Sequence, residues 1–139
     1  MSKVGEGGPM MIAAMALRAQ QARMRIISEN IANAESTASS PGGDPYRRQA
    51  PVFAPLRLEG GAVSVQMIAA RPDPAPFKTE YAPGHPAADP RGYVTLPNVD
   101  TIVEALDFKA AQRAYEANLN VIETSDAMEQ RTLDLLNKR

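Results

Sequence analysis

Apolar side chains recur at seven-residue intervals near the N-terminal end of the sequence. They are Met10, Leu17, Met24 and Ile31. Residues seven apart lie on one face of an α-helix, because two helical turns take about seven residues. We therefore predict an amphipathic helix over residues 10–35, preceded by a flexible, glycine-rich stretch at residues 1–9.

A second and longer amphipathic helix is predicted for residues 98–139. One seven-residue phase carries Phe108, Tyr115, Ile122 and Leu136, broken by Glu129, and the adjacent phase carries Ala114, Val121, Met128 and Leu135. Neither proline nor glycine follows Pro97 in the sequence, so nothing interrupts this pattern. We expect the helix to start with Asn98 as its N-cap or with Asp100 in its first turn.

Proline separates these two helices from the middle of the chain. Eleven of the 12 prolines lie between Pro41 and Pro97, and proline is excluded from helix interiors. Residues 36–97 are therefore predicted to form a small β-containing domain. Its candidate strands cover residues 63–68, 77–81 and 93–96. Because few aromatic side chains are available to fill its core, this domain should be marginally stable alone.

The predicted fold is mainly α with a small β part. It consists of long N- and C-terminal helices packed as a coiled-coil-like pair, with a proline-rich middle domain. The apolar stripes either face each other in an intramolecular hairpin or pack against other chains, and periodicity alone favours neither. Residues 10–34 carry a net positive charge and residues 98–139 a net negative charge, which supports pairing weakly.

Composition removes several classes of function. The 139 residues have a net charge of -1, so the chain lacks the basic field of a typical nucleic-acid-binding protein. Cysteine is absent, which excludes disulfides, thiolate metal ligands and cysteine nucleophiles. We expect no metal, no cofactor, no nucleic acid and no small-molecule substrate.

The catalytic candidates are weak. His85 with Ser125 and Asp126 supplies the residue types of a hydrolase triad, but His85 lies in a loop rich in proline and glycine, so we prefer a solvated loop histidine and assign no catalytic residue. The pair Arg47–Arg48 is weak evidence for an anionic ligand. We interpret the acidic side chains of the long helix as its solvated face. They are Glu104, Asp107, Glu123, Asp126 and Glu129.

The apolar run Pro9–Leu17 raises the alternative of a cleaved secretion signal, because Lys3 precedes it and Ala14–Ala16 resembles a cleavage site. Glu6 in the would-be positive region argues against this alternative, as does the helical phase that continues beyond the run. The run is also too short to span a membrane. We expect the N-terminal residues to be retained.

Four local strings carry more information. Asn30–Ala34 closes the N-terminal helix, Gly92–Asp100 precedes the last helix, Arg113–Asn118 lies within it, and Pro45–Gln49 reads Pro-Tyr-Arg-Arg-Gln. Together they resemble bacterial flagellar basal-body rod proteins of the axial rod and hook family, and most closely the proximal-rod C-subunit family. The resemblance extends over about residues 17–135.

Each string also has a purely structural interpretation. Asn30 and Asn33 fit a helix C-terminus, since asparagine tolerates the left-handed conformation that ends helices. The stretch Leu96–Asp100 fits a strand end, a proline stop and a helix start. Tyr115 and Asn118 lie one turn apart, which suits a half-buried tyrosine with a polar neighbour in a helix bundle.

The resemblance implies a structural subunit of the proximal rod, located in the flagellar basal body where the rod spans the periplasm. It implies helical polymerisation through the terminal helices to transmit motor torque. The implied partners are copies of the chain, other rod subunits and the flagellar type III export apparatus, with no membrane insertion by the chain itself. The residues expected at subunit interfaces are Leu17, Met24, Asn30, Ile31, Asn33, Tyr93, Leu96, Asn98, Val99, Asp100, Tyr115, Asn118 and Ile122. A coiled-coil adaptor or export chaperone, which would form a defined small oligomer, is the competing class.

Overall fold

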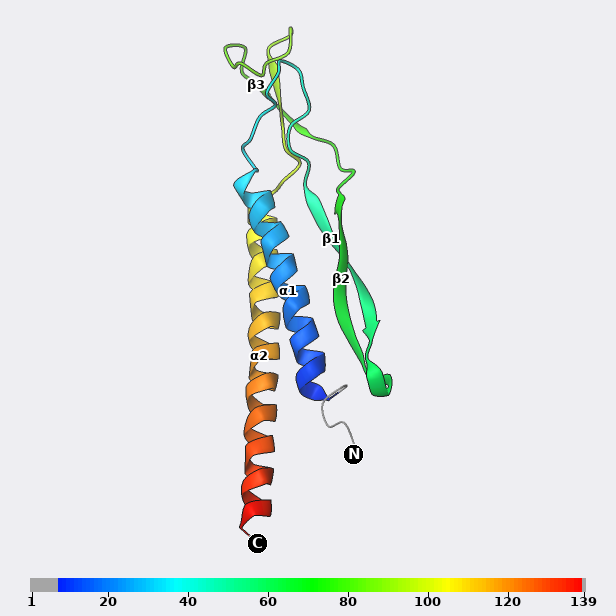
Figure 1. Ribbon diagram of the computed structural model, residues 1–139. Coiled ribbons are helices and arrows are strands. Elements are labelled where there is room, and N and C mark those ends of the chain that lie inside the picture. The colour runs from blue at the N-terminus through cyan, green and yellow to red at the C-terminus, as the bar shows by residue number, and fades with distance from the viewer. Residues whose placement is uncertain (1–7, 139) are drawn as a thin grey trace. The chain divides into compact units, whose positions relative to one another are not determined.

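The computed structural model describes residues 8–138 and confirms a mainly α fold with a small β part (Figure 1). Helix α1 runs over Pro9–Ala32 and helix α2 over Thr101–Asn137. The segment between them contains two hairpins. Their elements are strand β1 at Gln49–Arg57, the short 3-10 helix η1 at Glu59–Gly61, and strands β2 at Val63–Pro72, β3 at Lys78–Tyr81 and β4 at Tyr93–Leu96. No helix within residues 8–138 is long and apolar enough to cross a membrane.

The described chain divides into two compact units. Unit 1 comprises the described residues up to Met24, Phe53–Ile68 and the residues from Ala110 onward, and unit 2 comprises Arg25–Val52 and Ala69–Lys109. Both helices and the first hairpin contribute residues to each unit. The separate middle domain at residues 36–97 stays a prediction, and the flexible stretch predicted for residues 1–9 lies outside the described residues except at its last two positions.

Strands β1 and β2 form a two-stranded sheet closed by a turn that contains Gly60 and Gly61, whose φ angles are 80° and 84°. Strand β1 was not expected from the sequence, because it contains Pro51 and Pro55. A two-stranded sheet leaves one edge of each strand without a ladder partner, so proline can occupy positions where no N–H is required. In unit 1 the Ser64 hydroxyl donates a hydrogen bond of 2.8 Å to the Ile12 carbonyl of α1.

Strands β3 and β4 pair antiparallel, with Lys78 opposite Leu96 and Tyr81 opposite Tyr93. The two tyrosine rings meet edge to face, with centroids 5.3 Å apart. Gly92 precedes β4 with a φ of 89°, and a Cβ atom there would lie 2.9 Å from the Tyr81 ring. Glycine is therefore required at this position both for its conformation and for the close approach of the ring.

The helix ends differ in detail from the sequence-based expectations. The Asp100 carboxylate accepts hydrogen bonds from the backbone N–H groups of Ile102 and Val103, so Asp100 is the N-cap of α2, and neither Asn98 nor a first-turn Asp100 starts the helix. After α1, the Asn33 side chain donates to the Glu29 carbonyl at 2.8 Å. No non-glycine residue among 8–138 has a positive φ, so the expected left-handed asparagine is wrong.

The two units bury different kinds of side chain. Among the described residues of unit 1, the buried apolar side chains are all alanine, at Ala13, Ala19 and Ala111. Unit 2 buries larger ones. They are Ile26, Ile27, Val94 and Val99, together with Ala87. Burial of an alanine methyl contributes about 0.8 kcal/mol, against about 1.5–3 kcal/mol for a larger aliphatic side chain, so unit 2 has the stronger apolar core.

Candidate functional site

Unit 2 contains a connected set of polar side chains, which we call the junction cluster. Its members are Asn30, Tyr46, Arg48, Gln49, Asp73, Asn98 and Glu104. They come from the end of α1, the start of β1, the segment after β2 and the start of α2. Three of the four strings that carry the family resemblance therefore meet in one place.

Asn30 lies at the centre of the junction cluster and has no exposed surface. Its Nδ2 donates to the Gln49 carbonyl at 2.8 Å and to Glu104 Oε2 at 3.3 Å. Its Oδ1 accepts from the Tyr46 hydroxyl at 2.7 Å and from the Gln49 N–H at 2.9 Å. The amide thus makes four hydrogen bonds, which is its full capacity, and it joins the end of α1 to both β1 and α2.

Glu104 is a charged residue only 1% exposed. Its Oε1 accepts a hydrogen bond from Arg48 Nε, while Arg48 Nη1 pairs with Asp73 Oδ2 at 3.1 Å. Burial acts to lower the pKa of Arg48, but its hydrogen bonds and charge interactions with Glu104 and Asp73 together outweigh burial and raise that pKa above its ordinary value. The buried carboxylate is therefore paired, as a buried charge must be.

Asn98 ties two further backbone segments into the cluster. Its Oδ1 accepts from the Arg48 N–H at 2.8 Å, and its Nδ2 donates to the carbonyls of Asp73 and Ala75 at 3.2 and 2.9 Å. Arg47 donates to the same two carbonyls, and its guanidinium lies 4.0 Å from the centre of the Phe77 ring. The basic pair at residues 47–48 thus has structural partners within unit 2.

The Tyr46 hydroxyl remains a donor in this environment. Burial, with the nearby carboxylates of Glu29 and Glu104, raises the pKa of Tyr46 above its ordinary value. The protonated hydroxyl can therefore keep donating to Asn30 Oδ1. Within residues 8–138, no buried side-chain nitrogen or oxygen lacks a hydrogen-bond partner, which is the condition under which a polar cluster stabilises a fold.

The structure places the expected interface residues in four settings. Asn30 and Val99 are buried in unit 2. Asn33 and Asp100 make local hydrogen bonds, and Asn98 makes long-range ones within the junction cluster. Ile31 and Tyr93 are exposed, at 38% and 46%. The remainder are half-buried, namely Leu17, Met24, Leu96, Tyr115, Asn118 and Ile122. The Asn118 side chain donates to the Ala114 carbonyl of its own helix at 2.8 Å.

Sequence reasoning missed Gln49, Asp73 and Glu104 as members of the cluster. The assignment of Glu104 to the solvated face of α2 is wrong, because Glu104 is buried against Arg48 and Asn30. A signal was present in the spacing: Glu104 lies seven residues before Ala111, which is itself fully buried. The helical phase therefore placed this carboxylate on the inner face of α2.

An apolar stripe on the part of α2 in unit 1 is left uncovered. Val121, Met128 and Leu135 follow one another at seven-residue spacing and are 42%, 64% and 71% exposed. We call these three residues the outer stripe. An exposed apolar row of this kind is typical of a surface that packs against another protein chain.

His85 is used within its own loop, where its Nδ1 accepts a hydrogen bond from the Ala87 N–H at 3.0 Å. This contact occupies the ring nitrogen that a triad carboxylate would orient. Within residues 8–138, no group of three or more histidine, aspartate or glutamate side chains is arranged to hold a metal ion.

Known proteins of one family resemble this chain along most of its length. Residues 91–135 match the sequence family described as the C-terminal part of flagellar basal-body rod FlgEFG proteins. The chain is 44% identical to the flagellar basal-body rod protein FlgC of Agrobacterium fabrum, over 90% of this chain and 91% of that protein. The chain belongs to the FlgC family. FlgC of Salmonella typhimurium is 41% identical, over 89% and 92% of the two chains, and that of Borreliella burgdorferi is 39% identical, over 90% and 93%.

Membership of the FlgC family makes the chain a structural protein of the flagellar basal-body rod that assembles with other rod components. The matched region at residues 91–135 includes Asn98 and Glu104 of the junction cluster and most of α2. The same stretch therefore carries polar contacts of unit 2 and the whole outer stripe of unit 1.

The buried ion pair yields a stability prediction. Arg48→Met should leave the Glu104 carboxylate buried without its cation and destabilise unit 2 by about 3 kcal/mol or more. Replacing both partners, Arg48→Met with Glu104→Met, should recover most of that loss, because no unpaired charge remains. Thermal unfolding followed by circular dichroism measures both variants. An unchanged midpoint for Arg48→Met would contradict the role given to this pair.

Asp73 yields a pH prediction. Its hydrogen bond from the Ala75 N–H, with help from Arg48, holds the pKa of its carboxyl below the ordinary 3.8. A carboxyl whose pKa is lowered in the folded state stabilises the fold above its unfolded pKa and loses that contribution as the pH falls through the folded pKa. Unit 2 should therefore lose stability as the pH falls below 3.8.

The matched variant for this titration is Asp73→Asn, which keeps an oxygen for the Ala75 N–H but has no proton to gain. Its unfolding midpoint should fall less steeply with acid than that of the parent chain, while Asp89, whose pKa is also lowered, still titrates in both. Parallel curves for the two chains would show that Asp73 does not contribute.

Proposed function

We propose that the chain polymerises helically through its terminal helices, with copies of itself and with other rod subunits, and that the resulting rod transmits motor torque across the periplasm. The observation that supports this proposal most strongly is the composition of unit 1. Its buried apolar side chains among the described residues are alanines, whereas its leucines on α2, with Val121 and Met128, are exposed.

The exposed apolar area of unit 1 is large in relation to its core. Besides the outer stripe, Leu119, Leu133 and Leu136 are 38%, 56% and 66% exposed. Side chains of this size stabilise a helix when they are removed from water. Neighbouring subunits that cover them would supply the apolar contacts that the single chain lacks.

The expected interface residues divide by role under this proposal. The exposed and half-buried ones would contact neighbouring subunits directly, whereas Asn30, Asn98 and Asp100 would act through the local structure that they hold in place. Torque transmission requires a subunit that resists deformation, and a fully hydrogen-bonded cluster with a buried ion pair suits that requirement.

We further propose export through the flagellar type III apparatus with the N-terminal residues retained. Threading through a narrow channel requires an unfolded chain. The alanine-based core of unit 1 is consistent with low stability of this unit before assembly. A mature mass that begins near residue 17 would instead indicate a cleaved signal.

The outer stripe provides the test. Val121→Asp places a charge on a surface that the proposal buries between subunits, which should cost several kcal/mol if the contact is dry. We expect the variant chain to be made and exported, but to be missing from basal bodies, and the cells not to swim.

The control for this variant is Asn120→Asp, which adds the same charge at an exposed neighbouring position off the stripe. It should assemble and support swimming as the parent chain does. Normal swimming with Val121→Asp at normal protein level would mean that the outer stripe is not an assembly contact.

A further inference from the structure

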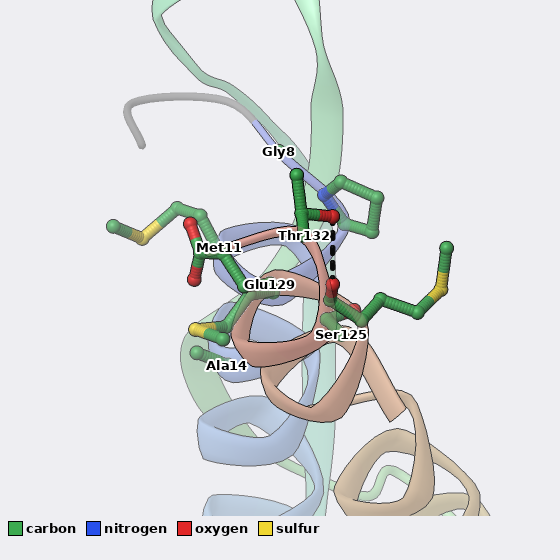
Figure 2. Close-up of a pocket in the computed structure, with 9 residues that line it drawn as sticks. Gly8, Met11, Ala14, Ser125, Glu129 and Thr132 are labelled. Carbon is green, nitrogen blue, oxygen red and sulfur yellow. Dashed lines mark hydrogen bonds between the residues drawn. The ribbon is translucent and has the colours of Figure 1, made fainter. Parts of the chain in front are cut away.

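Unit 1 contains an apolar groove where the first turns of α1 lie beside the second half of α2. Figure 2 shows Gly8, Met11 and Ala14 on the α1 side, and Ser125, Glu129 and Thr132 on the α2 side. The groove has a volume of about 670 Å³ and includes Met128 of the outer stripe in its lining. It is therefore continuous with the surface already argued to be an assembly contact.

Among residues 8–138, Glu129 is the one charged side chain that lines this groove. The Thr132 hydroxyl donates to the Met128 carbonyl of its own helix at 2.9 Å, the dashed line in Figure 2. Within residues 8–138 the Glu129 carboxylate forms no ion pair. An apolar groove with a single carboxylate is suited to an apolar segment that carries a basic residue.

The last turns of α2 have this chemistry. The lining of the groove ends at Thr132, and every residue from 133 to 138 is exposed. Leu133, Leu135 and Leu136 are 56%, 71% and 66% exposed, and the charged residues of this segment are Asp134 and, after it, Lys138. Lys138 cannot reach Glu129 of its own chain easily, because nine residues of helix separate them by about 13 Å.

We propose that the groove of one subunit receives residues 133–138, the end of α2 together with Lys138, from a second copy of this chain, with Lys138 of that copy facing Glu129. This proposal rests on the proposed function, and it names a second copy of the chain as the partner that occupies the groove. Groove and helix end are different surfaces of the same chain, so the contact is head-to-tail and can repeat from subunit to subunit.

Because the chain contains no cysteine, any disulfide formed by this protein must involve an introduced cysteine, which allows a crosslinking test. Chains with Met11→Cys and chains with Leu136→Cys, each with a different tag, are expressed together, and basal bodies are isolated and oxidised. The expected product is a mixed disulfide, formed about tenfold more than with the control pair Glu116→Cys and Leu136→Cys, since cysteines whose Cα atoms lie beyond about 7 Å cannot be bridged. Glu116 is exposed on α2 and does not line the groove.

The outcomes separate this contact from assembly in general. If the tagged chains are recovered in basal bodies without the mixed disulfide, or with equal crosslinking in the control pair, the groove contact is wrong and the proposed function stands. A predominant disulfide between two Met11→Cys chains would indicate a symmetric contact and also overturn it. If tagged chains without any cysteine substitution are missing from basal bodies, the proposed function itself fails.

A charge exchange tests the pairing of Glu129 with Lys138. Glu129→Lys in the chain that carries Met11→Cys should reduce the mixed disulfide several-fold. Adding Lys138→Glu to the chain that carries Leu136→Cys should restore it, because the pair is re-formed with its charges reversed. A loss that the second change does not restore would mean that Lys138 does not face Glu129.

Discussion

A carboxylate that is almost completely withdrawn from water organises unit 2. Glu104 is 1% exposed, so its charge must be paired within the protein, and Arg48 and Asn30 provide the partners. Arg48 directly precedes β1, and Asn30 lies near the end of α1. One buried charge therefore specifies how three distant segments of the sequence meet, and Asn98 and Asp73 extend the same network to two more.

The two units differ in the side chains that they bury and expose. Unit 2 has branched aliphatic side chains and a complete polar cluster in its interior, so it holds its structure by its own contacts. Unit 1 buries alanine and exposes valine, methionine and leucine along α2. We propose that such a unit obtains its remaining apolar contacts from neighbouring subunits.

Much of the fold could be predicted from periodicity and proline placement. Both helices were found to within a few residues, and strand β4 at residues 93–96 was predicted with its observed bounds. No strand was predicted over residues 49–57, where the structure has β1. Its two prolines are tolerated because a two-stranded sheet leaves one edge of each strand free.

The junction cluster was harder to predict, because its members lie far apart in the sequence. Asn30 and Glu104 are separated by 74 residues and meet only once the chain is folded. Local strings around Asn30, Arg48 and Asn98 were recognised, yet nothing local indicated that they contact one another. Glu104 was misplaced because its charge was weighed above its helical phase, which aligns it with buried Ala111.

The central claim is that unit 2 is stable by itself whereas α2 in unit 1 is completed by neighbouring subunits. Hydrogen–deuterium exchange on the free exported chain and on isolated basal bodies tests it most directly. Backbone amides around Asn30, Arg48 and Asn98 should be protected in both samples, and those of residues 119–136 should be protected strongly only in the assembled rod. Equal protection of residues 119–136 in the free chain would contradict this account.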